Sequence, residues 1–318
     1  MADEKHYDIV IVGAGPGGLC AGLYAARARR KVICLEKYLP GGQIAVTGEV
    51  EDYLGFEHIQ GAELGQKFRD HAVKFGLEIA MEEVEEVYVE GEDRVARCAS
   101  GTIYRARAVI LATGGAPVYL GVPGEREYAG RGVSYCAICD GAFFKNQVIA
   151  VVGGGDAAVE EGAFLTKFAS RVIVIHRRDQ LRAQKIIQQR AFDNPKMEFM
   201  WDTVVESIHG SDRQVTHLTV KNVKTGAHSE VKCGAVFPYI GFHPNTGYVR
   251  EKLTVDKDGY IITDYKMQTN VPGIFAVGDV RQQFVRQVTN AVGDGTVAAV
   301  AAEKYIEELE DKHAQRVK

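Results

Sequence analysis

One pattern occurs twice in this chain and strongly limits what it can fold into. The run YDIVIVGAGPGGLCAGLYAAR begins at Tyr7 and passes from a β-rich apolar stretch through a glycine-rich turn into a helix-like Ala/Leu pattern. The run QVIAVVGGGDAAVEEGAFL begins at Gln147 and repeats the same order. Glycines in such a turn let the chain approach a pyrophosphate and pack helix against strand. We therefore predict an α/β chain with two Rossmann-like three-layer dinucleotide-binding domains.

The candidate cofactor residues of the two turns follow from aligning the copies, because the N-terminus of each following helix would face the phosphates. In the first copy they are Gly13, Gly15, Pro16, Gly17 and Gly18. In the second copy they are Gly153, Gly154, Gly155, Asp156, Ala157 and Ala158.

The strand after each turn ends in a different residue. The first copy ends in Glu36, whose carboxylate can accept hydrogen bonds from a ribose 2′-hydroxyl. At the same spacing the second copy has His176, followed by Arg177 and Arg178, with Arg182 one helical turn further on. A guanidinium donates bidentate, charge-assisted hydrogen bonds to a phosphate. The second copy therefore predicts an NADPH site, and its alternative is a solvated basic helix start.

The first copy keeps its acid and so predicts a different dinucleotide. Two later segments, ARAVILATGG and VPGIFAVGDV, are apolar strands that end in tight turns, the second at Gly278 and Asp279. Each segment alone is also explained by a core strand followed by a turn. In this order, on either side of the second dinucleotide unit, they indicate FAD, with Asp279 near the ribityl chain.

Proline and glycine concentrate in two segments that we interpret as domain connections. They are GGAPVYLGVPGE, from Gly114, and IGFHPNTG, from Ile240. The predicted FAD domain comprises residues 1–116 and 245–318, with the NADPH domain, residues 117–244, inserted in it. Near the end, TVAAVAAEKYIEELE predicts an amphipathic helix and DKHAQRVK a frayed tail.

The start of the chain and its charge point to the cytoplasm. MADEKHYD has no signal-peptide pattern, and no uninterrupted apolar run reaches the roughly 18 residues of a membrane span. The net charge is −4, so we expect neither nucleic acid nor a membrane as partner.

Cysteine usage then narrows the chemistry. Of six cysteines, only Cys136 and Cys139 form a Cys-x-x-Cys pair. A structural zinc site would need further ligands at related spacing, so no metal is expected. Cytoplasmic thiols are kept reduced, which favours a redox couple. Asp140 is the candidate general acid and base, and a helix-start cap is compatible with that role.

Together these features resemble low-molecular-weight, bacterial-type NADPH-dependent thioredoxin reductase along nearly the whole chain. The motifs are CAICD, GGGDAA with HRR and Arg182, EKYLPGGQ and GDVRQQFVRQ. The resemblance implies a homodimer that reduces thioredoxin, with Cys139 against the flavin and Cys136 attacking thioredoxin. It also implies FAD contacts from Gly42, Gln43, Asp279, Arg286, Gln287 and Val288. It places Arg131, Phe143 and Phe144 on the thioredoxin-facing surface, with a core role for one phenylalanine as an equal alternative.

Other functions share part of this pattern. A related flavin disulfide reductase could serve another protein acceptor, such as a peroxiredoxin-reducing protein, but such proteins often carry an extra thioredoxin-like domain. A flavin dithiol oxidase would not need NADPH, and a ferredoxin–NADP reductase would lack the cysteine pair. A nucleotide-binding redox sensor would not turn over NADPH with a disulfide substrate.

Overall fold

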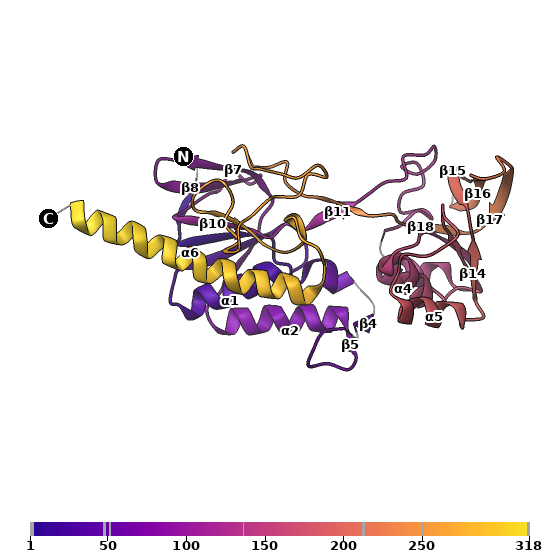
Figure 1. The fold of residues 1–318 in the computed structure, drawn as a ribbon, viewed down its shortest axis with the longest axis horizontal. Helices are drawn as coiled ribbons and strands as arrows, with labels where there is room; N and C mark the ends of the chain where they lie inside the picture. The colour runs from indigo at the N-terminus through magenta and orange to yellow at the C-terminus, as the bar shows by residue number, and fades with distance from the viewer. Residues whose placement is uncertain are drawn as a thin grey trace. The chain divides into compact units, whose positions relative to one another are not determined.

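The computed structural model describes residues 3–46, 49–50, 52–135, 137–211, 214–249 and 251–316. These residues form two compact units (Figure 1). The first holds the described residues of Met1–Ala45, Glu49–Ala116 and His243–Lys318, and the second those of Val46–Gly48 and Pro117–Phe242. The second unit is therefore inserted into the chain of the first.

A parallel sheet forms the centre of the first unit. Its described strands, in spatial order, are β20 (Ile274–Ala276), β10 (Ala108–Leu111), β2 (Ile9–Val12), β3 (Val32–Glu36) and β6 (Glu78–Met81). Because side chains alternate between the two faces of a strand, Ile9 and Ile11 enter one core cluster and Val10 and Val12 another. Burial on both faces explains the continuous apolar runs of the sequence.

Helices cover one face of this sheet and antiparallel strands cover the other. The helices are α1 (Pro16–Arg27), α2 (Gly61–Lys74) and α6 (Val288–Arg316), and α1 packs against both others (Figure 1). The antiparallel strands, in spatial order, are β1 (Glu4–His6), β9 (Ile103–Ala106), β8 (Asp93–Cys98) and β7 (Val84–Glu90). Shorter elements are η1 (Gly42–Val46), β4 (Glu49–Val50), β5 (Ile59–Gln60) and η3 (Gly278–Val280).

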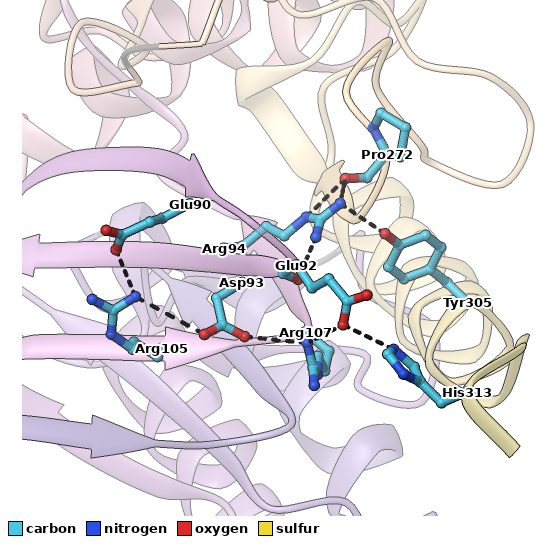
Figure 2. Close-up of polar contacts among 9 residues, drawn as sticks. All are labelled: Glu90, Glu92, Asp93, Arg94, Arg105, Arg107, Pro272, Tyr305 and His313. Carbon is cyan, nitrogen blue, oxygen red and sulfur yellow. Dashed lines mark hydrogen bonds and ion pairs between the residues drawn. The ribbon is translucent and has the colours of Figure 1, made fainter. Parts of the chain in front are cut away.

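Helix α6 is longer at both ends than the sequence predicted. It begins before two glycines, and a Cβ on Gly295 would lie 2.2 Å from the Gly17 carbonyl oxygen, so glycine permits close packing against α1. The predicted frayed tail is wrong for residues 311–316, which continue the helix. There His313 Nε2 lies 2.8 Å from Glu92 Oε2, which holds the last turns on the antiparallel sheet (Figure 2).

Arg94, which is only 7% exposed, also fastens α6 to that sheet. Its Nε and Nη2 donate to the Pro272 carbonyl at 2.9 and 2.5 Å, and Nη2 also donates to the Tyr305 hydroxyl at 2.7 Å (Figure 2). Its Nη1 donates to the Glu92 carbonyl at 2.6 Å. The loop before β20 is thereby fixed, and β20 leads directly to Gly278.

The second unit repeats the same architecture. Its described parallel sheet has, in spatial order, β14 (Met197–Met200), β13 (Arg171–Ile175), β12 (Val148–Gly153) and β18 (Ala235–Tyr239). One face packs against the helical elements α3 (Ala137–Asp140), η2 (Gly141–Phe144), α4 (Asp156–Leu165) and α5 (Lys185–Phe192). The other face packs against the antiparallel strands β15 (Thr203–Gly210), β16 (Val215–Asn222) and β17 (His228–Lys232).

The two connections between the units are the strands β11 (Gly115–Pro117) and β19 (Phe242–Pro244), which pair with each other. Each unit thus has a parallel sheet between a helical layer and an antiparallel layer. The predicted fold class, two Rossmann-like three-layer domains with one inserted in the other, is confirmed.

Candidate active site

The first glycine-rich turn is shaped for close backbone approach. Gly13 has φ of +102°, and a Cβ there would lie 2.5 Å from the Ala112 carbonyl oxygen at the end of β10. A Cβ on Gly18 would lie 1.9 Å from the Gly13 carbonyl oxygen. By contrast, no atom lies within 4 Å of a Cβ placed on Gly15. The turn is therefore closed toward the sheet and open at Gly15, just before the N-terminus of α1.

Glu36 is held beside this turn by two backbone amides. Its Oε2 accepts the Ala14 N–H at 2.7 Å and its Oε1 accepts the Tyr38 N–H at 2.8 Å. A carboxylate oxygen has more than one lone pair, so both oxygens can still accept a ribose hydroxyl. The position at the end of β3 agrees with the spacing argument made from the sequence.

Segments far apart in the sequence meet at the same turn. A Cβ on Gly42, whose φ is +60°, would lie 2.9 Å from the Gly15 Cα. A Cβ on Gly17 would lie 3.2 Å from the side chain of Val277, which precedes Gly278. The structure therefore brings the glycines predicted to contact FAD to one edge of one sheet.

Asp279 follows in η3, and burial raises the pKa of its carboxyl above the usual value, partly offset by the charge of Arg286. Its Oδ1 accepts the Gln283 Nε2–H at 3.1 Å. The Gln283 Oε1 is buried and has no hydrogen-bond partner among the described residues. The guanidinium of Arg286 lies 4.0 Å from the ring centroid of Tyr260.

These features fit a bound FAD. There is open space next to Gly15. The Glu36 carboxylate has lone pairs left over, and the buried Gln283 Oε1 has no hydrogen-bond partner among the described residues. Three further predicted contacts lie at the starts of elements near this edge: Gln43 in η1, Gln287 directly before α6, and Val288 as its first residue.

The second glycine-rich turn is equally tight. A Cβ on Gly153 would lie 2.3 Å from the Tyr239 carbonyl oxygen and 2.7 Å from the Ala158 Cβ. A Cβ on Gly154 would lie 2.4 Å from the ring of His176. Gly155 again has open space, so the second turn is also accessible at the position before its helix.

Next to that opening, one side chain of the turn, Asp156, has a structural role. The Asp156 carboxylate accepts the Gln184 N–H at 2.7 Å, which ties the turn to the start of α5. Ala157 is exposed in the first turn of α4.

His176 lies against Gly154 of this turn, and three arginines follow it in the sequence. Burial lowers the pKa of the His176 imidazole, and the nearby arginine charges lower it further. Its Nε2 is buried with no hydrogen-bond partner among the described residues. Arg177, Arg178 and Arg182 are exposed, and the Arg182 N–H donates to the Gly154 carbonyl at 2.6 Å. These groups fit the 2′-phosphate of NADPH.

The redox motif lies on the same unit. Cys136 lies outside the described residues, and Cys139 is the third residue of α3. The Ser134 N–H donates to the Val236 carbonyl at 3.1 Å, and the Ala137 N–H donates to the Tyr239 hydroxyl at 3.0 Å. The motif is therefore built on β18, whose last residue, Tyr239, is the register partner of Gly153.

Asp140 is half-buried and lines a hollow of about 210 Å³ together with Arg131, Ser134 and Phe143. Phe143 is 76% exposed, whereas Phe144 is 7% exposed and packs edge-on against Phe237. The alternative left open in the sequence is thus resolved, because Phe144 is the core residue and Phe143 is accessible.

Sequence reasoning did not identify Gln283, Glu161 or Tyr239. Burial and the neighbouring Glu160 charge raise the pKa of Glu161 to about 7, and its buried Oε2 has no partner in the described part of the chain. Tyr239 carries no motif, and only the three-dimensional structure shows its contact with Ala137. Local sequence contains no signal for such contacts between distant segments.

The remaining cysteines behave as small apolar residues. Cys34, Cys98 and Cys233 are buried, and Cys20 is half-buried. Burial raises the pKa of Cys98 and of Cys233 to about 12, so both stay protonated. Among the described residues, no group of His, Cys, Asp and Glu is arranged to hold a metal ion. In the same residues, no helix is long and apolar enough to cross a bilayer.

Comparison with known proteins agrees with this geometry. Residues 7–295 match the family described as pyridine nucleotide-disulphide oxidoreductase. A Bacillus subtilis protein named thioredoxin reductase is 48% identical over 311 residues, 98% of each chain. A crystal structure of Lactococcus lactis thioredoxin reductase superposes with a TM-score of 0.93 at 47% identity, over 95% of this chain and 99% of that one. A crystal structure of T. acidophilum thioredoxin reductase superposes with a TM-score of 0.90 at 33% identity, over 96% of this chain and 99% of that one. The chain therefore belongs to the pyridine nucleotide-disulphide oxidoreductases and, within them, to the bacterial-type thioredoxin reductases.

Proposed function

We propose that this chain is an NADPH-dependent thioredoxin-disulfide reductase. Electrons pass from NADPH through FAD to the Cys136–Cys139 disulfide and then to oxidised thioredoxin. The observation that carries this proposal is the position of the redox motif. The Ala137 N–H of the motif donates a hydrogen bond to the Tyr239 hydroxyl. Tyr239 is in turn the strand partner of Gly153, in the second glycine-rich turn. One unit thus combines a proposed nucleotide site with a cysteine pair, and relatives that are 47–48% identical over nearly the whole chain are named thioredoxin reductase.

We assign FAD to residues 1–116 and 245–318 and NADPH to residues 117–244. In the first unit, Gly13, Gly15 and Gly42 would admit the pyrophosphate, Glu36 the adenosine ribose, and Asp279 the ribityl chain. In the second, Gly153 and Gly155 would admit the NADPH pyrophosphate, and Arg177 and Arg178 its 2′-phosphate. When bound, NADPH supplies a hydride, and FAD delivers its two electrons to the disulfide.

The protein's own residues then complete the reaction. Reduction of the Cys136–Cys139 disulfide takes up two electrons and two protons and yields two thiols. The Cys136 thiolate attacks a thioredoxin sulfur and forms a mixed disulfide, with the other thioredoxin sulfur as leaving group. Cys139 then attacks the Cys136 sulfur, which restores the enzyme disulfide and releases the thioredoxin dithiol. Asp140, half-buried beside the hollow, holds or donates the proton that these steps exchange.

Steady-state oxidation of NADPH tests this function. The purified holoenzyme should consume NADPH only when oxidised thioredoxin is present. Two free thiols should appear on thioredoxin for each NADPH that is oxidised. If NADPH were consumed with a different disulfide protein but not with any thioredoxin, the chain would be a related flavin disulfide reductase with another acceptor. If NADPH were never consumed, the redox-sensor alternative would replace the proposal.

We also propose that the protein is a cytoplasmic homodimer. Apolar side chains of Tyr24, Val297 and Val300 are exposed on α1 and α6, two helices that pack together. A second copy covering these side chains would remove that apolar surface from water. Sedimentation of the holoenzyme should give twice the mass of one chain, and Tyr24→Glu with Val300→Glu should shift it to the monomer.

A further inference from the structure

The segment that leads into the redox motif is fixed along β18. Val133 and Val236 form a parallel bridge, and the Ser134 N–H donates to the Val236 carbonyl at 3.1 Å. Beyond Ser134, the chain enters the motif. There, two tyrosine hydroxyls form hydrogen bonds close to Cys136 in the sequence.

Tyr135, directly before Cys136, is anchored through a buried carboxylate. Its hydroxyl donates to Glu125 Oε1 at 2.7 Å. Glu125 is only 3% exposed, and it also accepts the N–H groups of Leu120 and Gly121, each at 2.7 Å. Three donors thus provide hydrogen bonds to this buried carboxylate. Tyr135 is thereby tied to the segment at the start of the inserted unit.

Tyr239 holds the residue on the other side of Cys136. Its hydroxyl oxygen accepts the Ala137 N–H at 3.0 Å. Burial raises the pKa of the Tyr239 phenol well above its usual value, so the hydroxyl remains neutral throughout the working pH range. Because Tyr239 ends β18 beside Gly153, the contact links the motif to a rigid strand of the central sheet.

We propose that Tyr135 and Tyr239 are positioning residues that brace the backbone on both sides of Cys136 and thereby favour closure of the Cys136–Cys139 disulfide. A disulfide forms only within narrow limits of Cα separation and dihedral angle. Ordering a backbone costs conformational entropy, and bonds that order it beforehand remove part of that cost from the closure step. The proposal rests on the proposed function only in taking the two cysteines as a redox couple.

The brace predicts a direction for the thiol–disulfide equilibrium. In this exchange a reference dithiol reduces the enzyme disulfide and is itself oxidised to a disulfide. Two electrons and two protons pass from the reference dithiol to the enzyme. Tyr239→Phe removes the acceptor of the Ala137 N–H, and Tyr135→Phe removes the donor to Glu125. Each change should move the equilibrium toward the enzyme dithiol by about threefold to tenfold, the size expected for one hydrogen bond.

The experiment equilibrates each holoenzyme with dithiothreitol at several ratios of its reduced and oxidised forms. Samples are quenched in acid and alkylated, and mass spectrometry measures the dithiol fraction of the peptide that contains Cys136 and Cys139. Tyr128→Phe is the matched control, because Tyr128 is buried in the same unit and its hydroxyl makes no hydrogen bond with any described residue. Urea unfolding of each variant reports its stability separately.

The proposal requires a shift toward the dithiol in Tyr239→Phe and in Tyr135→Phe that is absent from Tyr128→Phe. An unchanged equilibrium constant, a shift toward the disulfide, or an equal shift in the control would overturn it, even where stability falls. If Tyr135→Phe does not fold, Glu125→Gln tests the same Tyr135–Glu125 hydrogen bond, because an amide oxygen is a weaker acceptor than a carboxylate. The assay contains neither NADPH nor thioredoxin, so loss of the proposed function would leave its result unaffected.

Discussion

The arginine pair after His176 offers the sharpest test of cofactor assignment. Arg177 and Arg178 are exposed and make no ion pair with any described residue, so no carboxylate competes with a 2′-phosphate for them. A hydrogen bond to a charged group contributes about 1.5–3 kcal/mol, and we take the lower value because solvent screens these side chains. Arg177→Ala with Arg178→Ala should therefore lower kcat/KM for NADPH about tenfold or more.

NADH lacks the 2′-phosphate, so the same double variant should leave kcat/KM for NADH nearly unchanged. The assay measures both cofactors with thioredoxin as acceptor over a range of salt concentrations. A matched control, Arg126→Ala with Lys232→Ala, removes two positive charges from other exposed positions of the same unit. Its ratio of NADPH to NADH use should stay close to wild type.

Two outcomes would refute this reasoning. Equal losses with NADPH and NADH would mean that the arginines hold the turn together rather than bind the phosphate. A similar loss of NADPH use in the Arg126 and Lys232 control would mean that the overall charge of the unit, and not a local contact, attracts the cofactor.

Three further changes have defined outcomes. Cys139→Ser should trap a stable mixed disulfide between Cys136 and thioredoxin, visible on a non-reducing gel, whereas Cys136→Ser should not; normal turnover by Cys139→Ser would contradict the assigned roles. Arg94→Met should destabilise the first unit by about 1–3 kcal/mol in urea unfolding, because buried acceptors lose their donor, while kcat/KM for NADPH stays unchanged. The gain in unfolding free energy of Glu161→Gln over the wild type should be about 1–3 kcal/mol larger at pH 8 than at pH 5. Glu127→Gln, at an exposed position, is the control.

The sign of the Glu161 effect follows from its raised pKa. The folded protein keeps the Glu161 proton up to about pH 7, whereas the unfolded chain releases it above its ordinary value of 4.5. The wild type therefore loses stability as the pH rises through this interval, and the uncharged glutamine does not. A difference between variant and wild type that is independent of pH would show that Glu161 does not titrate in this range.

Local patterns predicted much of this fold because each pattern has one local cause. The apolar runs indicate strands buried on both faces. Gly13 and Gly153 indicate turns whose backbone has positive φ or packs unusually closely. The spacing to Glu36 and His176 then follows from the length of one strand–helix–strand unit. These features depend on neighbours in the sequence, so one sequence suffices to predict them.

Contacts that depend on distant segments were not predictable in this way. The start of α6 was missed because Gly293 and Gly295 weaken a helical pattern, while the reason for Gly295 is the Gly17 carbonyl on α1. Tyr239 has no local feature that marks it as a partner of Ala137. The same holds for Glu161, whose buried oxygen follows from packing around α4.

The proposed cofactor assignment also explains how one chain could keep two similar cofactors apart. At the same point in the unit, Glu36 presents a carboxylate fixed by two amides, whereas His176 is kept neutral by burial and lies against Gly154. Specificity is a difference between two affinities and is sharpened by a repulsive element. In the proposed assignment, the Glu36 charge would repel the 2′-phosphate of NADPH from the first turn, while Arg177 and Arg178 would attract it to the second. Because the two backbone turns are similarly tight, we expect these few side-chain charges to determine which dinucleotide each unit binds.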